Sequence, residues 1–154
     1  DTPAEIAGIQ GLEDAIINAE NHTLKFTVRD NIGLKSVTVY CDGKEIAKFG
    51  EKDFTAGDLV DAQFTISEAS SAQHIRIVAE DLSGNILDTD GTIEGSANTT
   101  VSFERDVTVS TNFFVRWFAN KPLFFGSIAV IVAAGVGIYF IVAKKHKKEK
   151  ATAE

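Results

Sequence analysis

Four polar residues in two turn-like segments have the chemistry to bind a cation. Asp30 and Asn31 end one run of alternating residues, and Asp81 and Asn85 follow another. Carboxylate and amide oxygens are hard ligands of the kind that Ca²⁺ prefers. The same residue types also stabilise turns through local hydrogen bonds, and the alternate acids of a calcium loop are missing. Two interpretations stay open: a Ca²⁺ site at these loops, or turn-forming residues with no cofactor.

The remaining residues that could do chemistry have no catalytic spacing. The separations among His22, His74 and His146 suit neither a metal site nor a nucleophile–base pair, and no serine lies in a G-x-S-x-G context. The single cysteine, Cys41, excludes an intrachain disulfide. It shares its parity with apolar neighbours, so we expect it to face a core. The sequence predicts no catalytic residues and a protein that is not an enzyme.

The segments that must position these residues have the pattern of short strands. Leu24, Phe26 and Val28 alternate with polar residues, the period-two pattern of a half-buried strand. Similar runs recur, separated by turn signals, at residues 37–41, 60–66, 75–79 and 101–109. About seven such strands, with no long helical pattern among them, predict an all-β, immunoglobulin-like antiparallel sandwich over residues 1–111.

Three shorter predictions complete the ectodomain. Asp42-Gly43 is a hairpin signal, so residues 44–49 should form a return strand. Residues 5–9 predict a first strand. Residues 11–19 fit either a short edge strand or a turn of helix, and both remain open.

Two stretches also resemble a known family. From Val28 to Lys44, an aspartate ends one strand and the next strand closes in Asp-Gly-Lys, as in the middle of bacterial immunoglobulin-like surface domains. From Ile77 to Asn85, the chain is similar to the strand of that family that ends in Ala-x-Asp-x-x-Gly-Asn. The resemblance covers roughly residues 3–110. It implies a module of the kind found in tandem on Gram-positive surface proteins, as spacer, adhesin segment or enzyme accessory.

A segment of a different kind follows. Residues 123–143 carry no charge and are mostly apolar. At about 1.5 Å per residue they would form a helix about 31 Å long, close to the thickness of a bilayer's hydrocarbon core. We predict one transmembrane helix there, and it is the expected anchor because the Leu-Pro-x-Thr-Gly sorting motif is absent. Ala129, Ala133 and Gly137 form a stripe of small residues, which would either let two helices associate or have no partner.

The flanks of this span predict its orientation. Residues 112–122 combine aromatic and basic side chains, typical either of a membrane interface or of a linker that packs on the sandwich; the anchor candidates are Arg116, Trp117, Phe118, Lys121 and Pro122. Residues 144–154 form a basic tail, typical of the cytoplasmic side, with Lys144, Lys145, Lys147 and Lys148. We expect a single-pass plasma-membrane protein with an extracellular N-terminal domain. Its export needs a signal upstream, either a removed signal peptide or the rest of a longer chain.

The uneven distribution of charge limits the classes of binding partner that we expect. Residues 1–121 carry 10 Lys and Arg against 20 Asp and Glu, whereas residues 144–154 carry 5 Lys against 2 Glu. The acidic ectodomain argues against nucleic-acid binding, and the basic tail suits an anionic lipid leaflet. The lipid bilayer is therefore the expected partner, and the expected function is a membrane-proximal spacer and anchor. The alternatives are a binding or adhesion module for a glycan or protein ligand, and a single-span subunit of a larger membrane assembly.

Overall fold

The computed structural model describes the backbone of residues 2–151 and the side chains of residues 2–145. The chain forms two compact units, one that ends at Arg116 and one that begins at Trp117.

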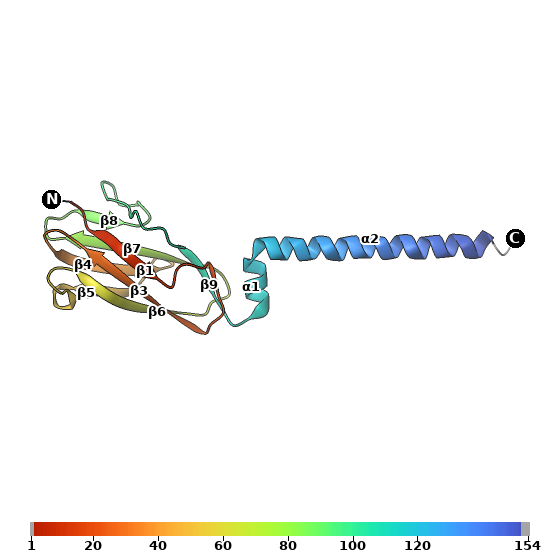
Figure 1. The fold of residues 1–154 in the computed structure, drawn as a ribbon, viewed down its shortest axis with the longest axis horizontal. Helices are drawn as coiled ribbons and strands as arrows, with labels where there is room; N and C mark the ends of the chain where they lie inside the picture. The colour runs from red at the N-terminus through yellow and green to blue at the C-terminus, as the bar shows by residue number, and fades with distance from the viewer. Residues whose placement is uncertain (1, 152–154) are drawn as a thin grey trace. The chain divides into compact units, whose positions relative to one another are not determined.

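The first unit is built from short strands (Figure 1). In chain order they are β1 Glu5–Gln10, β2 Ile16–Ile17, β3 Asn21–Arg29, β4 Leu34–Cys41, β5 Lys44–Gly50, β6 Leu59–Ser67, β7 Gln73–Asp81, β8 Ile86–Asp88 and β9 Asp106–Val109. A short 3₁₀ turn, η1, covers Glu51–Asp53 between β5 and β6. The hairpin predicted at Asp42-Gly43 is confirmed as β4 and β5, and the ambiguous residues 11–19 contain the two-residue strand β2.

The strands form two sheets. One has the order β1-β3-β6 and the other the order β2-β9-β7-β4-β5, with β8 also paired to β7. All the pairings of named strands are antiparallel except that of β2 with β9. In immunoglobulin nomenclature, β1, β3 and β6 correspond to strands A, B and E, and β4, β7 and β9 to strands C, F and G. The structure confirms the all-β, immunoglobulin-like antiparallel sandwich.

The core lies between the inward faces of the two sheets. The alternating residues of β3 are buried as the sequence predicts, with Leu24 and Val28 fully hidden and Phe26 2% exposed. The Phe26 ring packs edge-to-face against Phe49 and Phe64, at centroid distances of 5.8 and 5.6 Å. Edge-to-face packing of this kind adds about 0.5–1.5 kcal/mol to the burial of apolar area. Since Phe26 and Phe64 lie in one sheet and Phe49 in the other, these contacts join the inward faces of the two sheets.

The last strand, which pairs with β7, is shorter than predicted. Residues 101–109 were expected to form a last strand, but β9 includes only Asp106–Val109, and β8 occupies the same edge of β7 further along. Between β8 and β9 lies an excursion, residues 89–105. The chain turns away after β8 because the Asp88 carboxylate accepts backbone N–H groups from Asp90, Thr92 and Ile93. Val101 and Phe103 still pack against the core, without a strand pairing.

Two helices follow the strands. Helix α1 covers Phe113–Ala119 and α2 covers Lys121–Ala151. Within α2, residues Lys121–Lys145 are long and apolar enough to span a membrane, and their most apolar 18 residues have a mean hydropathy of 2.4 and include no buried residue. Pro122 lies in the first turn of α2, where its missing N–H is not needed for an intrahelical hydrogen bond.

Candidate functional site

The predicted anchor residues before the span form two separate sets of contacts. In the first unit, the Arg116 guanidinium donates a hydrogen bond to the Ser110 carbonyl oxygen at 2.7 Å. In the second unit, the Trp117 ring packs against the rings of Phe118 and Phe124, and its Nε1–H donates to the Ser127 hydroxyl at 3.3 Å. Lys121 and Pro122 are exposed at the start of α2. The aromatic stretch is thus helical, as its spacing predicts, whereas its place at a membrane interface stays a prediction.

The connection between the last strand and α1 is tied to the sandwich. Glu68, just after β6, accepts the N–H and the hydroxyl of Thr111 at 3.0 and 2.9 Å, and these bonds lower the pKa of its carboxyl. The Asn112 side chain then accepts the Phe114 N–H and caps the first turn of α1. Residues 110–112 therefore do not form a free linker.

The residues within and after the span are open to their surroundings. Ala129, Ala133 and Gly137 are all exposed on α2, and no neighbouring group lies within 4 Å of a Cβ placed on Gly137. Lys144 and Lys145 are exposed. The side chains of Lys147 and Lys148 lie outside the described residues. Helix association and the role of the basic tail stay predictions.

The two acidic loops lie at one end of the sandwich. The Leu82 N–H donates to the Gly33 carbonyl at 2.9 Å, so the loops are in direct contact. One oxygen of Asp30 accepts the N–H groups of Ile32 and Gly33 at 3.0 and 2.8 Å, while the Asn31 side chain accepts the Thr2 hydroxyl at 3.2 Å. The two bonds to Asp30 are those of a turn, whereas the Thr2–Asn31 bond joins two separate segments.

Asp81 has the same role in the second loop. Its carboxylate is fully buried and accepts the N–H groups of Ser83 and Asn85 and the Asn85 side-chain amide, each at 2.8 Å. Burial raises the pKa of this carboxyl, but the hydrogen bonds from Asn85 and its neighbours outweigh burial and leave the pKa lowered. Among the described residues, no group of three or more His, Cys, Asp or Glu side chains could hold a metal ion. Ca²⁺ binding stays a prediction. Turn chemistry accounts for the bonds that Asp81 and Oδ1 of Asp30 accept, whereas Oδ2 of Asp30 is buried with no hydrogen-bond partner among the described residues.

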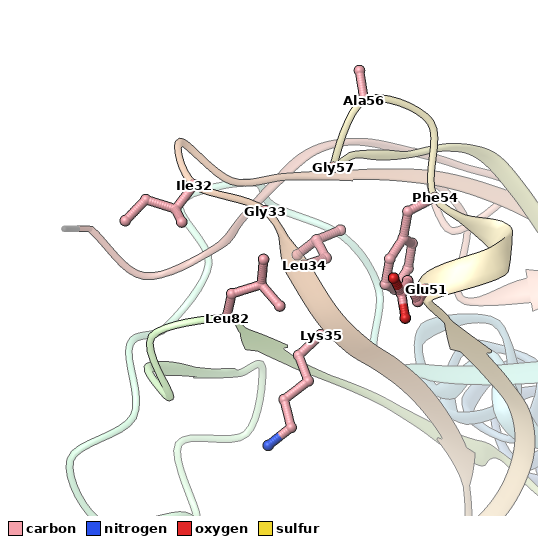
Figure 2. A pocket seen from close by; sticks show the side chains of 9 residues that line it. All are labelled: Ile32, Gly33, Leu34, Lys35, Glu51, Phe54, Ala56, Gly57 and Leu82. Atoms are coloured by element: carbon pink, nitrogen blue, oxygen red, sulfur yellow. The ribbon is translucent and has the colours of Figure 1, made fainter.

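An apolar pocket of about 330 Å³ opens beside these loops (Figure 2). Ile32 and Leu82 project at its rim and are 54% and 62% exposed, and Phe54 lies deeper on the opposite side. Lys35 and Glu51 contribute one charge of each sign to the lining. An exposed apolar rim with a few polar groups is typical of a surface that contacts a ligand or another protein.

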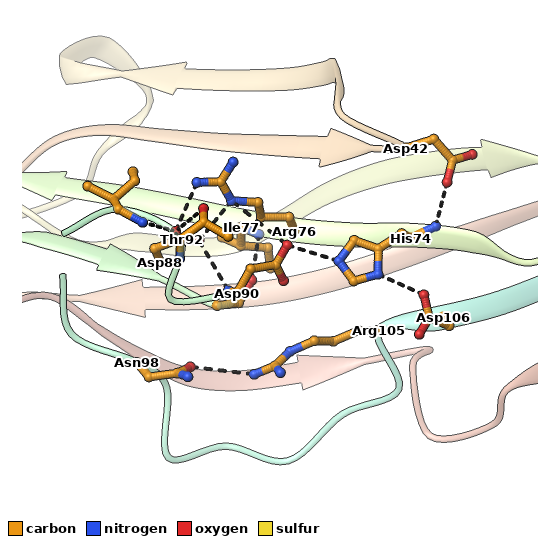
Figure 3. Close-up of polar contacts among 12 residues, drawn as sticks. Asp42, His74, Arg76, Ile77, Asp88, Asp90, Thr92, Asn98, Arg105 and Asp106 are labelled. Atoms are coloured by element: carbon orange, nitrogen blue, oxygen red, sulfur yellow. Dashed lines mark hydrogen bonds and ion pairs between the residues drawn. The ribbon is translucent and has the colours of Figure 1, made fainter.

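Figure 3 shows a polar network that the sequence did not predict, on β7 and the segments at its edge. Arg76 makes two parallel bonds to the fully buried Asp88 carboxylate, at 2.8 and 2.9 Å. Burial raises the pKa of Asp88, but the Arg76 bonds and the backbone bonds outweigh it and hold that pKa well below its usual range. His74, two residues before Arg76 and on the same face, bonds to Asp90 through Nε2 and to Asp106 through Nδ1.

Parity along β7 places His74 and Arg76 on one face, and this signal was available in the sequence. Their partners were not evident, because Asp88, Asp90 and Asp106 approach them only through the registers of β8 and β9.

Comparison with known proteins adds little to this picture. No family model matches the chain, and no curated protein is detectably similar to it. Among solved structures, the chain is similar to the fibronectin(III)-like modules of Clostridium thermocellum CbhA, with 16% identity over 70% of this chain and 95% of that one, at a TM-score of 0.37. At this score the fold assignment rests on the strand order and registers described above.

Proposed function

We propose that this chain is a membrane-proximal immunoglobulin-like module held by a single transmembrane helix, and that it acts as spacer and support for domains upstream. The observation that carries the proposal is the stretch Lys121–Lys145, whose most apolar 18 residues have a mean hydropathy of 2.4 and include no buried residue. Large side chains such as Val130, Ile131 and Ile141 are 66–71% exposed. In water so much exposed apolar surface would be unfavourable, whereas in lipid it is the favourable arrangement.

Physical chemistry explains how such a helix would hold the module. In an α-helix the interior backbone N–H and C=O groups bond to one another, so no interior backbone group of the span needs a partner from the bilayer. Moving one lysine of the tail to the bilayer centre costs about 2.5–3.5 kcal/mol, and Lys144 and Lys145 therefore oppose passage of the tail through the membrane. The Glu68–Thr111 bonds support a spacer role, since they hold the start of the connection against the sandwich.

The test is the topology of the full chain, expressed in bacteria behind an export signal. In a Cys41→Ser background, Ser102→Cys labels the ectodomain and Ala151→Cys labels the tail. We expect a membrane-impermeant maleimide to react with residue 102 on intact cells and with residue 151 only after permeabilisation. Labelling of residue 151 on intact cells would refute the proposed orientation, and recovery of the chain in the soluble fraction would refute the anchor.

A second candidate function, binding or adhesion, is favoured by the apolar pocket and the exposed rim residues Ile32 and Leu82. A glycan array probed with the full chain in nanodiscs would test it against a Leu82→Ser variant. Binding that the variant loses would support a ligand site at this end of the sandwich. Val60→Ser, at a half-exposed position on β6, is the matched control.

A further inference from the structure

His74 joins the two ends of the 89–105 excursion. Its ring lies between Asp90, where the chain has just left β8, and Asp106, the first residue of β9 (Figure 3). The Nε2···Oδ2 distance to Asp90 is 2.9 Å and the Nδ1···Oδ1 distance to Asp106 is 2.7 Å. One side chain on β7 therefore bonds to residues at both ends of the excursion.

Both contacts together require a protonated ring. A carboxylate only accepts hydrogen bonds, and a neutral imidazole carries a proton on one of its two nitrogens. The imidazolium can donate to Asp90 and Asp106 at once, whereas the neutral ring can serve only one of them. In accordance with this geometry, the hydrogen bonds from His74 to Asp106 and then to Asp90 raise the pKa of the His74 imidazole.

The two carboxylates differ in how much it costs them to lose the hydrogen bond to His74. The Asp106 side chain is 70% exposed, so water can replace its bond to His74. The Asp90 side chain is 18% exposed, and its Oδ1 is buried with no hydrogen-bond partner among the described residues. Losing the donor would therefore cost Asp90 more than Asp106.

The other charged groups around the ring do not remove this asymmetry. Asp42, in the turn between β4 and β5, accepts the His74 backbone N–H at 2.8 Å and adds negative charge that favours the imidazolium. The Nε atom of Arg76, on β7, lies 4.0 Å from Oδ2 of Asp90, but the two short hydrogen bonds of Arg76 go to Asp88. Arg105 donates to the Asn98 side chain.

We propose that His74 is a proton-operated clasp: the imidazolium holds Asp90 and Asp106 together, and loss of the ring proton frees Asp106 while Nε2–H stays bonded to Asp90. As the pH rises, the Asp106 side chain is then released to water, while the backbone hydrogen bonds from the Glu104 N–H to Leu12 and from the Ile75 N–H to Arg105 continue to hold the end of the excursion. At the start of the excursion, Asp88 still holds the N–H groups of Thr92 and Ile93. The clasp therefore makes a side-chain contact at one end of the 89–105 segment dependent on pH.

The test is an NMR titration of the full chain in nanodiscs from pH 5 to 9. We expect the His74 ring to titrate above 6.5, the ordinary value for histidine, and its neutral form to carry the proton on Nε2. The backbone amide signals of residues 104–107 should change with the same midpoint, whereas those of residues 90–93 should not. A midpoint at or below 6.5, a neutral ring protonated on Nδ1, or amide signals at 104–107 that ignore the ring would each overturn the proposal.

Asp106→Asn is the diagnostic variant, since it removes a charge at an exposed position and leaves the contact with Asp90. It should lower the His74 midpoint and abolish the pH response of residues 104–107. Glu94→Gln removes the same charge from an exposed side chain of the excursion that has no bond to His74, and it should change neither. Equal effects from the two variants would mean that general charge, rather than the clasp, controls the titration.

Discussion

The sandwich and the α2 helix use the same apolar residue types in opposite ways. In the sandwich, Phe26 is 2% exposed and packs between two other rings. In α2, Phe140 is 65% exposed, and so are most of the large apolar side chains around the helix. The residue type is the same in both regions. The sandwich forms its own apolar core around Phe26, whereas the apolar surroundings of Phe140 must come from outside the helix.

The difference lies in the patterning. The strands alternate apolar and polar residues, so each sheet has one face for the core and one for water. The α2 helix has apolar residues all round, and a helix without a polar face is buried either in a protein core or in a membrane. Its most apolar part has no buried residue, so the described residues provide no core for it.

The sharpest test of this comparison is one substitution made in both regions. Phe26→Ala should lower the free energy of unfolding of the sandwich by about 3–5 kcal/mol, because it leaves a cavity in a packed core. Phe140→Ala should weaken membrane insertion by only about 0.5 kcal/mol or less, since lipid fills the space. Denaturant unfolding of the full chain in nanodiscs, followed by the β-sheet signal in circular dichroism, measures the first effect. A large loss of sandwich stability from Phe140→Ala would break the comparison.

Adding a charge should reverse the sensitivity of the two regions. Val132, in α2, and Val60, on β6, are both about half exposed, at 58% and 49%. Val132→Arg should weaken insertion by about 2.5–3.5 kcal/mol, because the position lies near the centre of the span. Position 60 faces water, so Val60→Arg should change the free energy of unfolding by about 0.5 kcal/mol at most. The membrane-bound fraction after carbonate extraction reports the first; unchanged binding of Val132→Arg would argue against a spanning helix.

Asp88 is the place where the sandwich itself buries a charge. Asp88→Asn should lower the free energy of unfolding by about 1–3 kcal/mol, since it weakens the bonds from Arg76 and leaves its guanidinium partly unpaired. Because the folded-state pKa of Asp88 is lowered, its contribution is fully present above about pH 4, the unfolded value, and is lost progressively as the pH falls from there through the lowered folded-state value. The free energies of unfolding of the wild type and Asp88→Asn, plotted against pH, should therefore begin to approach each other only below about pH 4. Curves that stay parallel down to pH 3 would mean that this carboxylate does not couple stability to pH.

The opposite sign applies to His74. Because its folded-state pKa is raised, its contribution is full below pH 6.5 and is lost as the pH rises through the raised value. The acid limb of the stability profile thus tests Asp88, and the neutral-to-alkaline limb tests His74.

The parts of the fold that depend on local pattern were predictable. Leu24, Phe26 and Val28 show their buried face through alternation alone, and Asp42-Gly43 marks its hairpin. The three residues of β8 are too short to show a period, so Ile86–Asp88 could not be told from a loop. Asp88 looks like an ordinary loop acid, and its burial follows only from its contact with Arg76. The contacts of His74 depend on how β8 and β9 pair with β7. No single stretch of sequence encodes those two registers.

The smallest effect is expected from Ca²⁺ at the two acidic loops. Asp81 already accepts three hydrogen bonds from its own loop, and one oxygen of Asp30 accepts two. Calcium would have to replace these donors, although Oδ2 of Asp30 is buried with no hydrogen-bond partner among the described residues. We expect the unfolding midpoint to stay constant between excess chelator and millimolar Ca²⁺. Asp81→Ala should lower that midpoint equally in both conditions, since it removes the turn bonds. A rise with Ca²⁺ in the wild type that Asp81→Ala abolishes would instead reveal a ligand that binds only the folded state, because such binding stabilises by RT ln(1 + [L]/Kd). It would also make this end of the sandwich, with its exposed Ile32 and Leu82, the first place to look for a binding partner.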